Sequence, residues 1–218
     1  MGLSQYIGAS AYTKPGVCTS TTRPAAPYTG QVIFETDTNK MLVWNTSAWV
    51  IPNSPAQDPP GMGLIYSATV GTAVPSVTVS NCFNSTYDNY KIMWSGGISS
   101  GSANMKIQLT NITGANYRVG LSTVNFSTGT ATNQGQSGIT TFDWAGYADT
   151  TFALVDADIY NPFSSTKYKY FQSKYIGNTF GGAITGFCAD TTSSTGFTLS
   201  TGGASITGGT LAVYGYRK

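Results

Sequence analysis

The sequence contains no histidine and very few charged residues. Of its 218 residues, 9% are Asp, Glu, Lys or Arg, and the formal net charge is +2. Without histidine, the chain cannot form a Ser-His-Asp or Cys-His nucleophile system or an imidazole metal site. No phosphate-binding loop is present, and there is no clustered basic face of the kind that a nucleic-acid partner requires. We therefore expect no cofactor, no metal and no nucleic acid.

Cysteine is also scarce, with only Cys18, Cys82 and Cys188. An odd number at wide spacing predicts neither a disulfide framework nor a zinc site. Each is expected to be a small buried side chain. A bond between Cys82 and Cys188 stays open as an alternative if their strands adjoin.

Long apolar runs and an export signal are missing as well. Residues 1–20 lack a basic segment followed by an apolar core, so no signal peptide is expected. No apolar stretch reaches the ~20 residues that a membrane helix needs, so membrane insertion is not expected.

Abundant glycine, aromatic residues and turn signals indicate an all-β protein. From residue 64 onward, strand patterns recur roughly every ten residues, which predicts an antiparallel β-sandwich of jelly-roll type. In residues 104–110, Met105, Ile107 and Leu109 should face the core. Residues 128–138 read as a long exposed loop. Residues 167–174 could form an aromatic-and-basic stripe for a nucleic acid, but the favoured interpretation is a strand whose Tyr and Phe side chains pack on one side while its lysines face water.

Composition also divides the chain. Residues 1–22 are small and polar and predict an attachment arm. Residues 23–51 predict a β-hairpin module, and the Pro/Gly-rich residues 52–63 predict a linker. Residues 64–218 form the predicted sandwich.

The predicted hairpin carries apolar side chains on both faces. An isolated hairpin is only marginally stable in water, so the module should pack against the rest of the chain or against copies of itself. The side chains expected at an interface between copies are Val32, Phe34, Leu42, Trp44 and Trp49.

Carboxylates are the remaining candidates for chemistry. Asp156 and Asp158 lie two apart in a predicted strand and so share one face. They could act as a glycosidase pair, hold part of a calcium site, or form a solvent-facing strand edge, and the last is favoured. A second group could line a sugar pocket or consist of turn residues beside core aromatics: Asp143, Trp144, Tyr147 and Asp149.

Parts of the sequence resemble a protein family. The matching residues, Gly30, Thr36, Asp37, Thr38, Trp44, Asn45 and Trp49, resemble a hairpin module of bacteriophage fibre and virion proteins that clusters by threes. Thr46 stands where that module has glycine, which predicts a wider second turn. Residues 87–92 and 208–216 resemble strands of jelly-roll domains in phage fibre and decoration proteins.

The resemblance implies a non-enzymatic structural protein of a phage particle, located in the virion. It implies a homotrimer that attaches to other virion proteins through the N-terminal arm. The C-terminal domain would bind a host-surface glycan or serve particle cohesion, as a short fibre or a decoration protein. The alternatives are a polysaccharide-degrading glycosidase that uses Asp156 and Asp158, or a free lectin.

Overall fold

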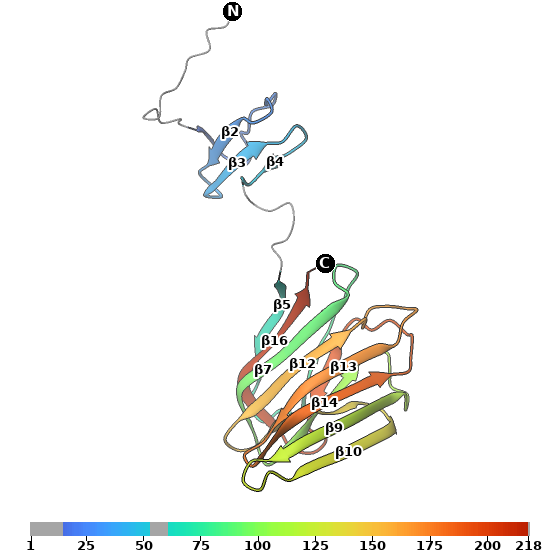
Figure 1. Cartoon of the computed structure of the whole chain (residues 1–218). Coiled ribbons are helices and arrows are strands. Elements are labelled where there is room, and N and C mark those ends of the chain that lie inside the picture. Colours follow the sequence, from blue (N-terminus) through green and yellow to red (C-terminus); the bar gives the residue numbers. More distant parts are fainter. Residues whose placement is uncertain (1–14, 53–60, 218) are drawn as a thin grey trace, which may run out of the picture. The chain divides into compact units, whose positions relative to one another are not determined.

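The computed structural model describes residues 15–52 and 61–217. The chain divides into two compact units, Met1–Pro59 and Pro60–Lys218. This division falls within the expected linker, residues 52–63, of which 53–60 lie outside the described residues. Residues 1–14 of the expected arm lie outside them too. Every regular element in the described residues is a β-strand, which confirms the all-β class (Figure 1).

The N-terminal unit is a four-stranded mixed sheet in the order β1-β2-β3-β4. Its strands are β1 (Gly16–Cys18), β2 (Val32–Glu35), β3 (Lys40–Trp44) and β4 (Trp49–Val50). β2 and β3 form the expected hairpin, β4 extends it on one side, and β1 pairs in parallel with β2 on the other. The sheet is larger than a lone hairpin because these two short strands satisfy backbone groups that a hairpin leaves unpaired.

Polar side chains stabilise the turns and loops of this unit. Asp37 accepts a hydrogen bond from the backbone N–H of Ser20 at 2.9 Å, which fixes the segment before the hairpin. Residues 45–48 separate β3 from β4, and the side chain of Asn45 accepts from the N–H of Ala48 at 2.9 Å. Thr46 adopts a φ of 89°, so this turn keeps a left-handed residue although it is wider than a two-residue turn.

The C-terminal unit is one antiparallel network of twelve strands. The strands are β5 (Met62–Thr69), β6 (Ser76–Val79), β7 (Asn89–Ser99), β8 (Ala103–Leu109), β9 (Tyr117–Asn125), β10 (Ala131–Ile139), β11 (Phe142–Ala148), β12 (Ala153–Tyr160), β13 (Lys169–Ile176), β14 (Phe180–Cys188), β15 (Phe197–Ser200) and β16 (Ile206–Tyr216).

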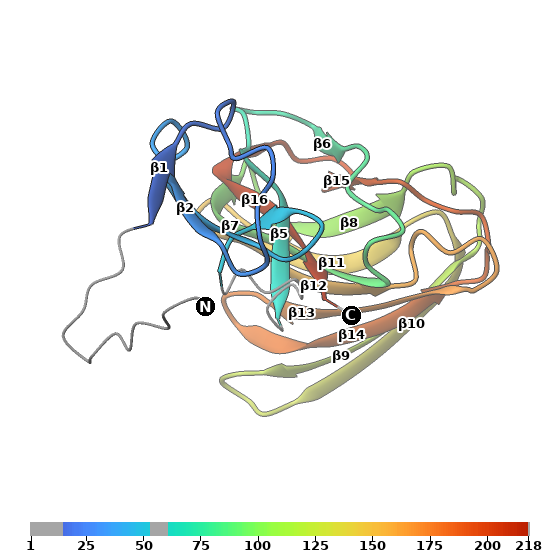
Figure 2. The ribbon, with the colours of Figure 1, turned by 90° about the horizontal axis from the view of Figure 1, so that it is seen from above.

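The network branches at β12. One run of strands is β5-β16-β7-β12-β13-β14-β9-β10, and the other is β11-β8-β15-β6. They join where the start of β12 pairs with the end of β11. The two runs face each other as layers (Figure 2). Ring contacts cross between them: Phe142 of β11 stacks on Phe171 of β13 at 4.5 Å and meets Tyr117 of β9 edge-on at 4.8 Å.

The interior follows the alternation of the strands. Met105, Ile107 and Leu109 are buried, as the pattern of residues 104–110 predicts. The indole N–H of Trp94, at the centre of β7, donates to the carbonyl of Gly208 at 3.1 Å, so even this large core side chain has its polar atom satisfied.

Two local predictions are wrong. Residues 131–139 are not loop but β10, which pairs with β9 along its length; none of its side chains is buried, so apolar alternation could not reveal it. In residues 167–174, Lys169 does not face water but is fully buried, and Tyr168 and Tyr170 do not pack inward but are 47% and 52% exposed. Its ammonium donates to the carbonyls of Ser164, Lys167 and Asp190 at 2.9, 3.1 and 3.1 Å, which compensates its burial.

The cysteines are free. Cys82 and Cys188 are buried as expected, whereas Cys18 is only half-buried. Burial raises the pKa of the Cys82 thiol to about 12 and that of Cys188 to about 11. Both thiols therefore stay protonated at neutral pH and behave as small apolar side chains.

Candidate functional site

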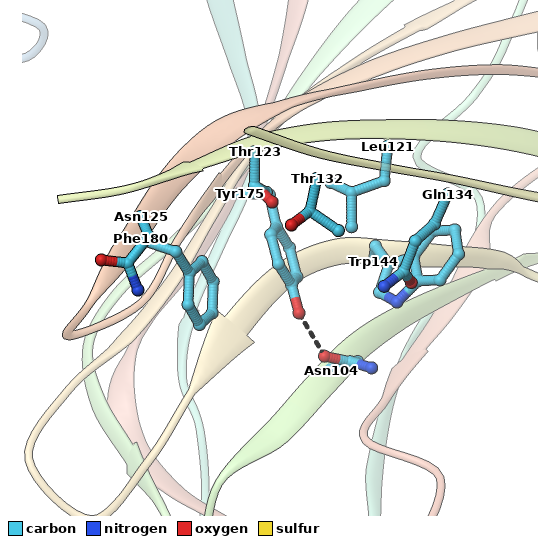
Figure 3. A pocket seen from close by; sticks show the side chains of 9 residues that line it. All are labelled: Asn104, Leu121, Thr123, Asn125, Thr132, Gln134, Trp144, Tyr175 and Phe180. Atoms are coloured by element: carbon cyan, nitrogen blue, oxygen red, sulfur yellow. Dashed lines mark hydrogen bonds between the residues drawn. The ribbon is translucent and has the colours of Figure 1, made fainter. Parts of the chain in front are cut away.

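A cavity of about 350 Å³ opens between the β9–β10 hairpin and β11. We call it the Trp144 cleft. Its lining comes from β8, β9, β10, β11, β13 and β14, as the close view shows (Figure 3). The lining residues are Asn104, Leu121, Thr123, Asn125, Thr132, Gln134, Trp144, Tyr175 and Phe180.

The hairpin provides one wall of the cleft through simple alternation. Thr132 of β10 lies directly opposite Thr123 of β9, and Gln134 lies opposite Leu121. Directly opposed residues of an antiparallel pair share one face, so hydroxyls and an amide project from this wall. The next residue in this series, Gln136, has a buried amide oxygen that accepts no hydrogen bond from the described part of the chain.

Trp144 provides the opposite side, and its backbone is unusual. Its φ is 59°, in the left-handed region, where a bulky side chain is a genuine outlier. The cause is a break in the register of β11 against β8 between Phe142 and Gly146, which leaves the residues between them outside the ladder. The indole thereby faces the cleft, and only 6% of the residue is exposed.

An aromatic group completes the cleft. Tyr175 and Phe180 stack with their ring centres 5.2 Å apart, and Tyr147 meets both rings edge-on from outside the lining. The hydroxyl of Tyr175 donates to the side-chain oxygen of Asn104 (Figure 3). Burial raises the pKa of Tyr175 to about 12, so this phenol remains a protonated donor at neutral pH.

The lining contains no charged side chain. Its polar groups are amides and hydroxyls, which both donate and accept hydrogen bonds, and its apolar groups are flat rings. Such a cleft suits a neutral ligand that carries many hydroxyls beside an apolar ring face, and lacks the charged partners that an ionic ligand would need.

The structure separates the four residues predicted for a sugar pocket. Trp144 lines the cleft, and Tyr147 supports its aromatic group. Asp143 instead forms an ion pair with Lys106 at 3.0 Å. Asp149 accepts from the hydroxyl and N–H of Thr151, both at 2.7 Å, in a tight turn.

The environment of Asp149 also favours a structural role. Hydrogen bonds from Thr151, followed by those from Phe152 and Asn178, lower the pKa of this carboxyl.

The polar wall of the cleft was not predicted, because residues 128–138 lack any apolar signal. Only the polar residues at the alternate positions 132 and 134 could have suggested it.

Asp156 and Asp158 do share one face of β12, as predicted, but the favoured solvent-facing strand edge is wrong. β12 pairs with β7 on one side and β13 on the other, and both carboxylates are mostly shielded and engaged. Lys91 pairs with both carboxylates, at 3.3 Å in the case of Asp158, and Lys174 pairs with Asp156. The hydroxyl of Tyr216 donates to Asp158. Burial opposes ionisation of Asp156, but hydrogen bonds from Lys174 and Lys91 lower its pKa overall. A general acid needs a raised pKa, so these contacts favour a structural role.

The residues predicted at an interface between copies lie on two faces of the N-terminal sheet. Leu42 pairs with Ile33 and is buried within the unit. Trp44 and Trp49 lie on that same face, with ring centres 5.6 Å apart. Val32 and Phe34 point to the other face.

We call that other face the apolar face. Register partners place its side chains together. Val17 is 70% exposed and Met41 48% exposed. Its members are Val17, Val32, Phe34, Met41, Val43 and Val50.

No protein-family model, no curated protein and no solved structure matches this chain. In residues 15–52 and 61–217, no helix is long and apolar enough to cross a membrane. In the same ranges, no group of three Cys, Asp or Glu side chains gathers in a way that could hold a metal ion.

Proposed function

We propose that this chain is a non-enzymatic binding protein whose C-terminal unit holds a neutral saccharide in the Trp144 cleft. The observation that carries this proposal is the backbone of Trp144. A left-handed aromatic residue costs on the order of 1–3 kcal/mol, and such strain clusters at ligand sites. Here the strained residue faces an uncharged cavity lined by amides, hydroxyls and two further rings.

We further propose that the C-terminal unit is a jelly roll with two added hairpins. Taken in chain order without β9, β10, β13 and β14, eight strands remain. One layer then holds the first, eighth, third and sixth of them, and the other holds the second, seventh, fourth and fifth. A jelly roll of eight strands and two Greek keys has this order. The β13–β14 and β9–β10 hairpins extend the first layer beyond β12.

For the whole protein we propose a short fibre or decoration role in a phage particle, with association as a homotrimer. The hairpin resemblance supports this role. So does the apolar face, because no second layer of strands covers this sheet among residues 15–52, the described part of the unit. In this proposal the N-terminal arm contacts other virion proteins and the Trp144 cleft takes a host-surface glycan.

A glycan array followed by calorimetry on the full chain tests the saccharide proposal. Gln134→Ala removes a polar group from the wall of the cleft. Asn133→Ala removes the same kind of group from the opposite side of β10, where Asn133 lies across from Ser122. We expect Gln134→Ala to weaken binding of a neutral oligosaccharide about tenfold and Asn133→Ala to leave it unchanged. Absence of any neutral saccharide binding, or equal effects of the two variants, contradicts the proposal.

Light scattering tests the association. The full chain should have the mass of a trimer, and residues 62–218 alone the mass of a monomer. Val17→Lys together with Met41→Lys places charge on the apolar face at exposed positions and should dissociate the full chain. Tyr28→Lys is the control, because Tyr28 is 70% exposed in the same unit but belongs to no strand. A full-length monomer refutes this part of the proposal.

A further inference from the structure

A second hollow lies on the other side of β9 from the Trp144 cleft. Successive residues of a strand point to opposite faces, so Arg118 and Gly120 project away from the side that carries Leu121. The hollow is a shallow groove of about 340 Å³ across β9 and β14. We call it the Arg118 groove. It is lined by Arg118, Val119, Gly120, Thr185, Gly186 and Phe187.

Arg118 provides an available positive charge in this groove. Its guanidinium lies 5.2 Å from the ring centre of Phe187, and the residue is exposed. None of the ion pairs between described residues includes Arg118, whereas Lys91, Lys106 and Lys174 each pair with an aspartate. A guanidinium held over a ring can still present its N–H groups to a carboxylate.

Aromatic rings continue the surface across the next strands. Arg118, Phe187 and Tyr170 are register partners on β9, β14 and β13, so they form one row on the same face. The ring of Phe187 lies 6.5 Å from that of Tyr170 and 6.4 Å from that of Tyr168. The two tyrosines are 52% and 47% exposed. The row therefore offers flat apolar faces with polar tips directly beside the cation.

Two glycines leave the neighbouring row open. Gly120 and Gly135 lie directly opposite each other on β9 and β10. A Cβ on Gly120 would meet nothing closer than 4.0 Å, and one on Gly135 nothing closer than 3.8 Å, and neither glycine has a positive φ. At Gly182, by contrast, a Cβ would lie 1.9 Å from the carbonyl oxygen of Ser122. Packing requires glycine at 182 but not at 120 and 135.

We propose that the Arg118 groove binds an acidic saccharide, with a sugar carboxylate on Arg118 and a sugar ring against Phe187 and Tyr170. The open glycine row admits the neighbouring sugar units. A saccharide fits better than a nucleic acid because one unpaired cation faces this groove, and nucleic-acid affinity rests on several phosphate contacts. The site is separate from the Trp144 cleft, so the two proposals stand or fall independently.

Calorimetry on the full chain tests the groove with four probes: an oligomer of a uronic acid, an oligomer of sialic acid, a neutral oligosaccharide of equal length, and a single-stranded oligonucleotide. We expect at least one acidic oligomer to bind, with an affinity that falls as salt is added. Arg118→Gln should weaken that binding at least tenfold. Lys167→Gln makes the same charge change at an exposed position that does not line the groove and should have no effect.

A second variant separates loss of charge from loss of shape. Gly120→Val fills the groove at an exposed strand position where space is free, so it should fold normally and still lose the acidic oligomer. Gln134→Ala, in the Trp144 cleft, should not affect this binding. The proposal is overturned if neither acidic oligomer binds, if Arg118→Gln and Lys167→Gln behave alike, or if a single-stranded oligonucleotide binds as tightly as the acidic saccharide.

Discussion

The left-handed backbone at Trp144 makes a prediction whose sign can be tested. In an ordinary strand, glycine is less stable than alanine by roughly 0.5–1 kcal/mol because glycine loses more backbone freedom on folding. Trp144 has a φ of 59°, where a Cβ costs roughly 1–2 kcal/mol and glycine costs nothing. We therefore expect Trp144→Gly to be more stable than Trp144→Ala.

The magnitude follows from the same two effects. Both variants lose the packing of a nearly buried indole, which costs about 3–5 kcal/mol, and this loss cancels between them. The remaining difference favours glycine by about 0.5–1 kcal/mol. Tyr147 supplies the control, because it lies in the same strand without a positive φ. There, alanine should be more stable than glycine by about 0.5–1 kcal/mol.

Urea unfolding of residues 62–218 measures these differences. Trp94 is fully buried in this unit, so its fluorescence reports unfolding in all four variants. The glycine-minus-alanine difference at 144 should exceed that at 147 by about 1–2 kcal/mol, which is the penalty of the left-handed Cβ. Equal differences at the two positions would show that the backbone of Trp144 is not strained, and the main support for a ligand site there would be lost.

Three further changes have expected outcomes. Lys169→Met leaves three backbone carbonyls without their donor, so the unfolding free energy should fall by about 3 kcal/mol or more; a loss below about 1 kcal/mol in urea would contradict this. Gly182→Ala should destabilise by more than about 2 kcal/mol because its Cβ meets backbone, whereas Gly120→Ala should be neutral or slightly stabilising. Thermal melts measure this, and a lower melting temperature for Gly120→Ala than for Gly182→Ala would contradict it. The pKa of Asp149 is lowered by its hydrogen bonds, so its stabilising effect is present at neutral pH and is lost as the pH falls below about 4; Asp149→Asn should flatten the acid side of the stability–pH curve, and an unchanged curve would contradict the assignment.

Alternation predicted much of the core because a strand with one buried face has apolar and polar residues at alternate positions. Met105, Ile107 and Leu109 illustrate this, since each is separated from the next by a polar residue and all are buried. The hairpin of the N-terminal unit was likewise predictable from its turn residues. The parallel pairing of β1 was not, because residues 16–18 carry no signal beyond their own short length.

The missed features depend on contacts between distant segments. Lys169 alternates with exposed residues, as an inward-facing residue does, but its charge led to the prediction that its side chain faces solvent. One of the three carbonyls that accept a hydrogen bond from it belongs to Asp190, 21 residues away in the sequence. The backbone of Trp144 likewise depends on how β11 pairs with β8 and β12. Local patterns in a single sequence therefore predict neither the burial of Lys169 nor the backbone conformation of Trp144.

The β9–β10 hairpin connects the two proposed sites. β10 has no buried side chain, so it adds little apolar burial to the core and its contribution to stability is mainly backbone pairing. Its residues instead lie on two opposite faces of the sheet. Thr132 and Gln134 form a wall of the Trp144 cleft, and Gly135 extends the open row beside the Arg118 groove. β10 packs against the core only through the partly buried Ile139, whereas its Thr132 and Gln134 line the Trp144 cleft, so we infer that binding accounts for this strand more than core packing does.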